Sequence, residues 1–385
     1  MNKIMNIIAE ETNGKSFNTF KYSFDLNRMP SLDYENDKKG IQWSECGETN
    51  KYTHYKSLKE LADNIKNTEP IIRYFLDGSR HVFKVDDITY NKQVYPVIAG
   101  QIGVGCCERI NKQLKACKFY KKYVISLPDK SISDSWNEKA TLINTIEKVN
   151  KSKLLIRMGV KFDKLLIYST SKMLDMPSKL EDRGISTVQE EMIAYEKQMV
   201  LDLVKENKLN QDSYLLKDGS LEYSNIGKKE YEEKDLQKIK HNYRWVIGVS
   251  KSFNPESIKD ASKKPNSNYI ADLPLFCRTP VARYTNSFMG DVSFAVWYVR
   301  IRDKKNTLTP FDGVIKVEKI LMDEELETGI NSDEVDLITA TLINERNPTC
   351  YGSDKRWANH LYPVYLTESY VKSKYLSEEL FLSLF

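Results

Sequence analysis

The chain has 385 residues, of which 41% are hydrophobic and 29% are charged, and its 58 basic and 54 acidic side chains give a formal net charge of +4. This composition is typical of a globular protein with one large domain or two ordinary ones, and its 23 Tyr, 14 Phe and 5 Trp argue against disorder. No stretch approaches the roughly 18 uninterrupted apolar residues that a membrane span needs, and the first residues predict no secretory signal.

Charge and cysteine content narrow the class of protein only slightly. The small net charge permits a nucleic-acid partner without indicating one. None of the cysteines forms a CxxC pair, and none of the four histidines lies at zinc-finger spacing from them. We therefore expect reduced thiols in a cytoplasmic protein rather than a zinc site or a disulfide framework. The six cysteines are Cys46, Cys106, Cys107, Cys117, Cys277 and Cys350.

The predicted elements begin with a polar segment, residues 1–68, which we interpret as an amino-terminal extension with one helix near residues 57–65. The remainder, residues 69–385, is predicted to form one domain with helices at its carboxyl end. Between residues 71 and 104, short β-rich segments predict three antiparallel strands joined by turns, and Asp77-Gly78-Ser79-Arg80 is predicted to be the first turn.

Strands and helices then alternate. Residues 131–158 are helix-prone, and residues 164–168 have the short apolar pattern of a strand in the middle of a sheet. Thr187-Val188-Gln189-Glu190 resembles a capping box, which predicts a helix from there to residue 204. Further strands are predicted at 214–217, 245–249, 292–302 and 313–320, and helices at 333–344 and 366–384. The fold class is therefore α/β, a mixed sheet in which an antiparallel meander precedes parallel strands, flanked by helices.

Two aspartates share one sequence context. Asp77 and Asp218 each follow an apolar strand and are each followed by Gly-Ser. Acids at the carboxyl ends of neighbouring strands lie at the edge of an α/β sheet where ligands bind. Two such carboxylates repel each other unless a cation lies between them, and hard oxygen ligands select Mg²⁺ or Mn²⁺. The alternative is that Asp-Gly-Ser is common turn chemistry.

A third acid is expected from the helix between them. Glu196 lies inside the apolar stripe of that helix, and a carboxylate on a buried face requires a partner, which a metal would supply. Glu190 and Glu191 are the competing candidates, although they fit the solvent-facing charges of a first helical turn. The choice among the three stays open at this point, with Glu196 preferred by position.

The order of these features resembles the NurA nucleases. In that family an apolar strand ends in Asp-Gly-Ser, and a meander, a helix with a glutamate and a second strand ending in Asp-Gly-Ser-Leu follow it. The similarity extends from about residue 70 to about residue 375 and is carried by short motifs. The further matching motifs are Gly248-Val249-Ser250-Lys251-Ser252, Trp297-Tyr298-Val299-Arg300-Ile301, residues 336–348, and Tyr362-Pro363 with the helix after it.

The resemblance implies an RNase H-like fold and a metal-dependent deoxyribonuclease that hydrolyses DNA phosphodiesters with two Mn²⁺ or Mg²⁺ ions. Asp77, Glu196 and Asp218 would be the metal-binding catalytic acids, and Lys251 would contact the nucleic acid. The family also implies a homodimer that works with a hexameric HerA-type ATPase. DNA-end processing in repair and antiviral defence would use the same site.

One position departs from the family pattern. The family has a histidine eight residues after the tyrosine of its Tyr-Pro motif, and here that position is Tyr370. His360, two residues before Tyr362, is the nearest histidine and is our candidate for the catalytic role, although Tyr370 or neither residue could fill it. This departure supports an alternative hypothesis, in which the chain is a catalytically inactive RNase H-like DNA-binding or scaffold subunit of an ATPase complex.

Overall fold

Three long strands lie side by side in the main sheet of the structure. They are β5 (Ile72–Tyr90), β6 (Gln93–Ile110) and β7 (Gln113–Pro128), and they pair antiparallel. The two connections between them, Asn91-Lys92 and Asn111-Lys112, have positive φ at all four residues. Two-residue hairpin turns of this kind match the right-handed twist of the strands, and Asn accepts the left-handed conformation at low cost. An antiparallel meander is confirmed, but its strands differ from the predicted ones: residues 71–104 hold only β5 and part of β6, and β7 was not predicted.

The computed structural model describes residues 4–16, 22–23, 41–42, 47–132, 138–171, 179–222, 233–255, 258–259, 264, 266–286, 292–304, 307, 309–346 and 357–385. The helices are α1 (Ile4–Glu11), α2 (Lys59–Ile65), α3 (Glu138–Asn150), α4 (Lys153–Met158), α5 (Leu180–Lys205), α6 (Glu233–Tyr243), α7 (Ser267–Ala271), α8 (Glu325–Thr328), α9 (Ser332–Asn344), α10 (Tyr362–Lys372) and α11 (Glu378–Leu382), with short 3₁₀ turns at Asp129–Ser131 and Trp357–Asn359. The remaining strands are β1 (Lys15–Ser16), β2 (Tyr22–Ser23), β3 (Ile41–Gln42), β4 (Lys56–Ser57), β8 (Lys164–Tyr168), β9 (Tyr214–Asp218), β10 (Val246–Ser250), β11 (Ile258–Lys259), β12 (Cys277–Arg278), β13 (Ala282–Asn286), β14 (Val292–Arg300) and β15 (Val314–Ile320).

One mixed sheet organises these elements. Within the described ranges it contains 13 strands, and its main path runs β4-β12-β14-β15-β10-β9-β5-β6-β7-β8. The pairs β5–β9, β9–β10 and β7–β8 are parallel, whereas the meander and the β14–β15 pair are antiparallel. The predicted fold class, a mixed α/β sheet flanked by helices, is confirmed.

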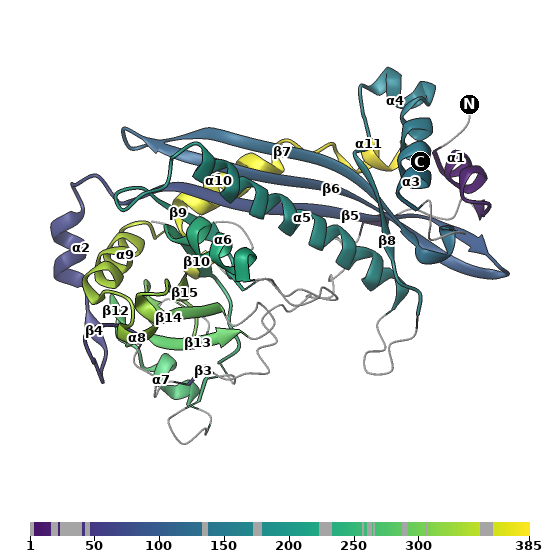
Figure 1. Cartoon of the computed structure of the whole chain (residues 1–385). Coiled ribbons are helices and arrows are strands. Elements are labelled where there is room, and N and C mark those ends of the chain that lie inside the picture. Colours follow the sequence, from purple (N-terminus) through teal and green to yellow (C-terminus); the bar gives the residue numbers. More distant parts are fainter. Residues whose placement is uncertain are drawn as a thin grey trace.

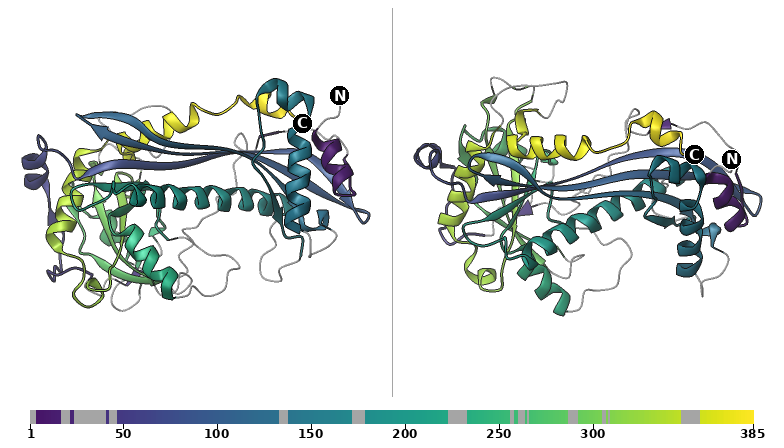
Figure 2. Two further views of the ribbon diagram at one scale, coloured as in Figure 1. Left: turned by 45° about the horizontal axis from the view of Figure 1, so that its top comes forward. Right: turned by 90° about the horizontal axis from the view of Figure 1, so that it is seen from above.

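Helices α5 and α10 cover opposite faces of the long strands. Figure 1 and both views of Figure 2 show α5 running along one face of β5–β7 and α10 lying on the other. Two glycines of β6 mark these faces. A Cβ at Gly100 would lie 2.7 Å from the side chain of Val188 on α5, and a Cβ at Gly105 would lie 2.6 Å from that of Val371 on α10. Both helices therefore pack closely against the strand backbone.

The far end of the long strands forms a separate apolar core. It contains buried side chains of α1, α3 and α11, together with the outer halves of β5–β7. The carboxyl-terminal Phe385 packs in the same cluster as Ile4, so α1 and the carboxyl end of the chain lie together there (Figure 1). Among the described residues, no helix has both the length and the apolar character to cross a membrane.

Parts of the predicted amino-terminal extension join the rest of the fold. β1 and β2 pair with β5, and β4 pairs with β12. Glu48 is buried and accepts two hydrogen bonds from Arg278, at 2.7 and 2.9 Å, while Arg278 also contacts Asp336 of α9 at 2.7 Å. This fully buried arginine links the segment before β4 to both the sheet and α9.

Three further local predictions are wrong. Residues 77–80 do not form a turn, because β5 continues through them and pairs with β6 along almost its whole length. Thr187 does not cap a helix, because α5 begins at Leu180 and the Thr187 hydroxyl donates to the Gly184 carbonyl inside it. β8 lies at the end of the main strand path rather than in its middle. Helices α3 and α5 pack against it at that end.

Candidate active site

Asp77 and Asp218 lie beside each other on parallel strands. Leu76 of β5 pairs with Lys217 of β9, so the next step of the register brings the two aspartates side by side. Neighbouring strands are about 4.8 Å apart, and residues at the same register position share a face. Asp77 also pairs with Gly105, which marks the α10 face of the sheet. Both aspartates therefore point toward the face that α10 covers.

The sheet forms an edge at this point because its strands have different lengths. β9 ends at Asp218 and β10 ends at Ser250, while β5 continues far beyond Asp77. The chain turns sharply after β9 at Gly219, whose φ is +87°. Glu318 stabilises this turn by accepting hydrogen bonds from the Ser220 hydroxyl at 2.7 Å and the Leu221 amide at 2.8 Å.

Lys251 follows β10 and connects two acids at this edge. Its Nζ lies 2.8 Å from Asp218 Oδ2 and 3.6 Å from Glu368 Oε2 of α10. The side-chain amide of Asn359 donates to the Lys251 carbonyl and so fixes the backbone there. Burial alone would lower the pKa of Lys251, but Asp218, Asp77 and Glu368 raise it above its ordinary value. This lysine is therefore a buried cation.

The Asp77 carboxylate is the least compensated of these groups. The residue is 5% exposed, and its Oδ2 is buried with no hydrogen-bond partner among the described residues. Burial raises the pKa of Asp77 well above its usual value, Asp218 raises it further, and Lys251 opposes the shift. An unpaired buried carboxylate requires either a proton or a cation.

Glu196 lies on the other face of the sheet. A methyl group at Gly78 would overlap Oε1 of Glu196 and lie 3.0 Å from its Cδ, so the glycine makes room for the carboxylate. Since Gly78 follows Asp77 directly, alternation along β5 places Glu196 opposite the Asp77 side chain. Lys217 neutralises Glu196 at 3.1 Å and also donates to the Asp218 carbonyl at 2.9 Å. Burial, opposed by Lys217, raises the pKa of Glu196.

The structure thus brings Asp77, Asp218 and Lys251 together, and it places Glu196 against the same stretch of β5 from the α5 side. The charge of Glu196 still contributes to the raised pKa of Asp77. Of the two competing acids, Glu190 is exposed and Glu191 contacts Lys164 at 2.8 Å.

His360 follows Asn359 along the chain, and Tyr370 lies on α10, two residues after Glu368. His360 is buried, and its ring lies 6.4 Å from the ring of Tyr365. Its neighbour Asn359 makes the contact with Lys251. Tyr370 packs edge-on against Phe119 of β7, with 5.6 Å between ring centroids.

Sequence reasoning missed Glu368, the acid that α10 contributes. Burial alone would raise the pKa of Glu368, but Lys251 and Lys372 outweigh this effect and lower the pKa below its ordinary value. A signal was available in the sequence. Val364, Thr367 and Val371 form the buried stripe of α10, and Glu368 borders that stripe.

The resemblance implies divalent cations, and the residues present fit them in part. Asp77, with its unpartnered oxygen, and Asp218 are suitable hard ligands on one face of the sheet. Within the ranges that the structure describes, however, no three His, Cys, Asp or Glu side chains are already arranged to hold a metal ion. Lys251 contacts one of the two Asp218 carboxylate oxygens, so a cation shared by the two aspartates would bind beside its ammonium or displace it.

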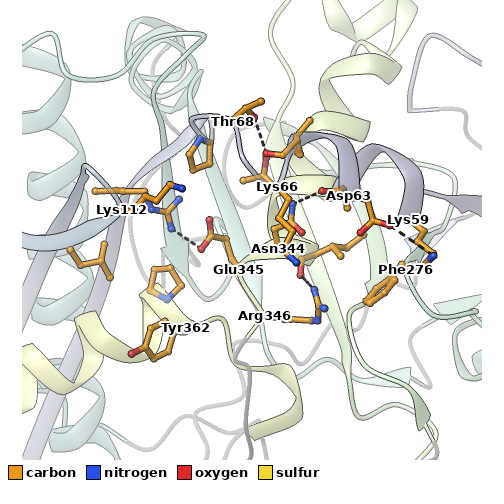
Figure 3. Close-up of a pocket in the computed structure, with 18 of the residues that line it drawn as sticks. Lys59, Asp63, Lys66, Thr68, Lys112, Phe276, Asn344, Glu345, Arg346 and Tyr362 are labelled. Atoms are coloured by element: carbon orange, nitrogen blue, oxygen red, sulfur yellow. Dashed lines mark hydrogen bonds and ion pairs between the residues drawn. The ribbon is translucent and has the colours of Figure 1, made fainter.

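A basic pocket of about 660 Å³ lies on the same face, where α2, α9, α10 and the β6–β7 turn meet (Figure 3). Arg109 and Glu345 form a 2.6 Å ion pair in it, and the exposed side chains of Lys66 and Lys112 stand at its rim. Tyr362, at the start of α10, also lines it. Helix α10 therefore extends from this pocket to Glu368 at the candidate site.

Comparisons with known proteins give one structural match to report. No protein-family model matches the chain, and no curated protein matches it. Among solved structures, it is similar to the NurA nuclease from Sulfolobus solfataricus, with 13% sequence identity, a TM-score of 0.40, and coverage of 82% of this chain and 85% of that chain. Neither the identity nor the TM-score is high enough to transfer an activity.

Proposed function

We propose that this protein is a metal-dependent deoxyribonuclease whose site is centred on Asp77 and Asp218. The observation that carries the proposal is the pairing of two aspartates on adjacent parallel strands, one of which keeps a buried carboxylate oxygen without a partner among the described residues. Structural ion pairs normally satisfy such oxygens, because an unpaired buried charge is costly. A site that keeps one unsatisfied is a functional candidate.

Each residue of the site has a distinct role in the proposal. Asp77 and Asp218 hold the cation, as Mn²⁺ or Mg²⁺. When bound, such ions lower the pKa of water and stabilise charge on a transferring phosphoryl group. Lys251 neutralises Asp218 in the absence of a cation, and its ammonium becomes available to a phosphate oxygen when a cation replaces it.

Glu196 and His360 support the site in this proposal. Glu196 fills the space beside Gly78 and keeps Lys217 charged, and Lys217 in turn holds the carbonyl of Asp218. His360 stays a catalytic candidate because it adjoins Asn359, which fixes the Lys251 backbone. Glu368 is added as the acid that shares Lys251 with Asp218.

The substrate and partners follow the same proposal. The basic pocket that Lys66 and Lys112 border would hold the phosphates of a DNA strand next to the site, through contacts that weaken with salt and do not read sequence. We further propose a cytoplasmic homodimer that acts with a HerA-type hexameric ATPase in DNA-end processing or antiviral defence. Charge reversal at Lys66 and Lys112 would lower DNA affinity and reduce its salt dependence, and fluorescence anisotropy measures both.

Cleavage assays on two conservative variants test the function. Asp77→Asn and Asp218→Asn keep the shape of each side chain and remove its charge. We expect each to abolish Mn²⁺-dependent cleavage of DNA while circular dichroism and the melting temperature show a folded protein. Cleavage at the wild-type rate by either folded variant would reject the site.

A second candidate function, an inactive scaffold or DNA-binding subunit, is favoured by one observation. Lysines already neutralise two of the acids, Lys217 at Glu196 and Lys251 at Asp218. In a scaffold these ion pairs would be permanent. Such a protein would bind DNA with an affinity that does not change when Mn²⁺ is added, and it would cleave no DNA under any metal condition.

A further inference from the structure

Three cysteines gather at one irregularity in the β6–β7 pair. Cys106 pairs with Lys118 and Cys107 pairs with Ala116, which leaves Cys117 as the extra residue of a β-bulge. Cys106 is fully buried, whereas Cys117 is only partly buried. Cys106 also pairs with Leu76 on its other side, the residue before Asp77. The bulge therefore lies one residue from the candidate site.

The sulfur of Cys117 has two polar neighbours. Lys208, just after α5, places its Nζ 3.2 Å from Cys117 Sγ. Cys106 is the second neighbour, across the strand pair and in the same apolar cluster. Lys208 also contacts Glu206 at 3.1 Å, so an ion pair holds it in place. One sulfur thus has an ammonium on one side and a second thiol on the other.

These surroundings shift the pKa values of the two thiols in opposite directions. Cys106 and Lys208 lower the pKa of Cys117 to about 6, although burial and Glu108 oppose the shift. Cys117, burial and Cys107 raise the pKa of Cys106 well above its usual value. At neutral pH Cys117 is the thiolate and Cys106 is the proton donor. A low-pKa thiolate beside a second thiol is the arrangement of a redox-active pair.

We propose that Cys117 and Cys106 form a peroxide-sensitive dithiol that closes into a reversible intramolecular disulfide. The partly exposed Cys117 meets the oxidant, and the buried Cys106 resolves the product. In the bulge Cys117 and Lys118 both lie opposite Cys106, so the two cysteines are neighbours across the strand pair. Both side chains also belong to the same apolar cluster.

The chemistry balances with hydrogen peroxide as the oxidant. The Cys117 thiolate attacks one peroxide oxygen, the O–O bond breaks, and hydroxide leaves and is protonated to water. The resulting sulfenic acid is attacked by the sulfur of Cys106, which loses its proton as the S–O bond breaks and a second water leaves. Two electrons pass from the two thiols to the peroxide, and an external dithiol returns them on reduction.

Two measurements on the full chain test this proposal. Iodoacetamide labelling followed by peptide mass mapping gives the rate at each cysteine as a function of pH. We expect Cys117 to react about 10-fold faster or more than Cys277 at pH 7, with a midpoint near the pKa of about 6. Lys208→Gln is expected to raise that midpoint and slow the reaction at pH 7 several-fold. Stoichiometric hydrogen peroxide is expected to yield one disulfide-linked peptide pair, 106–117, which dithiothreitol reverses.

Two variants separate the roles of the thiols. In Cys106→Ser, peroxide is expected to leave a sulfenic acid on Cys117 that dimedone captures, whereas Cys277→Ser is expected to form the 106–117 disulfide like the wild type. The labelling measurement on the wild-type protein does not depend on whether any variant folds. Cys117 reacting no faster than Cys277, or peroxide giving no 106–117 pair in the wild type, would overturn the proposal.

Discussion

Asp77 and Asp218 come from distant parts of the chain and lie side by side at the point where β9 ends and β5 continues. Their carboxylates share one face of the sheet, yet within the described part of the chain only Asp218 has an ion-pair partner there, Lys251 at 2.8 Å. This asymmetry means that the pair is not a closed structural salt bridge. One acid is neutralised by the protein itself, and the other must be neutralised by a proton or by something that binds.

The raised pKa of Asp77 should make the stability of the protein depend on pH. Since its folded-state pKa is raised, its contribution to stability is fully present below the unfolded-state pKa of about 3.9 and is lost as the pH rises through the folded-state pKa. Asp77→Asn should therefore raise the free energy of unfolding at pH 7 by about 1–3 kcal/mol and have little effect near pH 4. Urea denaturation in EDTA at both pH values measures this. The exposed Asp212→Asn is the control, and equal shifts for both variants at pH 7 would contradict the account.

Lys251 should contribute more to the free energy of unfolding than an ordinary surface lysine does. Lys251→Met leaves Asp218 and Glu368 without their shared cation, so we expect it to lower the free energy of unfolding at pH 7 by about 3–5 kcal/mol. Lys372 contacts the same glutamate at 2.7 Å but is half exposed, so Lys372→Met should cost about 1 kcal/mol or less. Equal losses for the two variants, measured by urea denaturation, would show that Lys251 is not a buried cation.

Gly78 should be intolerant of any side chain while Glu196 is present. A methyl group there would overlap the Glu196 carboxylate, so Gly78→Ala should destabilise the protein by about 1–3 kcal/mol. In a Glu196→Ala background the space is vacant and the penalty should shrink, giving a coupling energy of about 1 kcal/mol or more in a double-mutant cycle. Additive effects in that cycle would mean that the two residues do not compete for the same volume.

Two residues of α10 can be distinguished by activity. Glu368 contacts Lys251, whereas Tyr370 packs on Phe119. We therefore expect Glu368→Gln to lower metal-dependent DNA cleavage about 10-fold or more and Tyr370→Phe to leave it within about 2-fold. The opposite result would show that the Tyr370 hydroxyl, and not Glu368, takes part in the reaction.

The sequence predicted most elements of this fold because their patterns are local. Apolar runs and turn residues identified the strands around Lys164–Tyr168, Tyr214–Asp218 and Val246–Ser250. The pattern failed at Asp77, where Asp-Gly-Ser is typical of a turn but the chain stays extended. Pairing with β6 along the whole of β5 determines that conformation, and a window of a few residues does not contain it.

The sequence predicted that Asp77 and Asp218 lie together, but it did not predict the face of the sheet on which each acid of the candidate site lies. Two copies of Asp-Gly-Ser identified Asp77 and Asp218, and the strand register brings them together. Glu196 was chosen as a buried acid, and it is 4% exposed, but only the packing of α5 decides on which side of the sheet it lies. The contacts of Lys251 with Asp218 and Glu368 join three distant segments, so the spacing of residues along the sequence does not predict them.

Calorimetric titration of the metal-free protein with Mn²⁺ at pH 7 tests the central claim, that Asp77 and Asp218 share a cation, without relying on any activity. The account predicts measurable binding to the wild type and a loss of affinity of about 100-fold or more in folded Asp77→Asn and Asp218→Asn, with Asp212→Asn unchanged. No binding to the wild type, or equal binding by all four proteins, would contradict it.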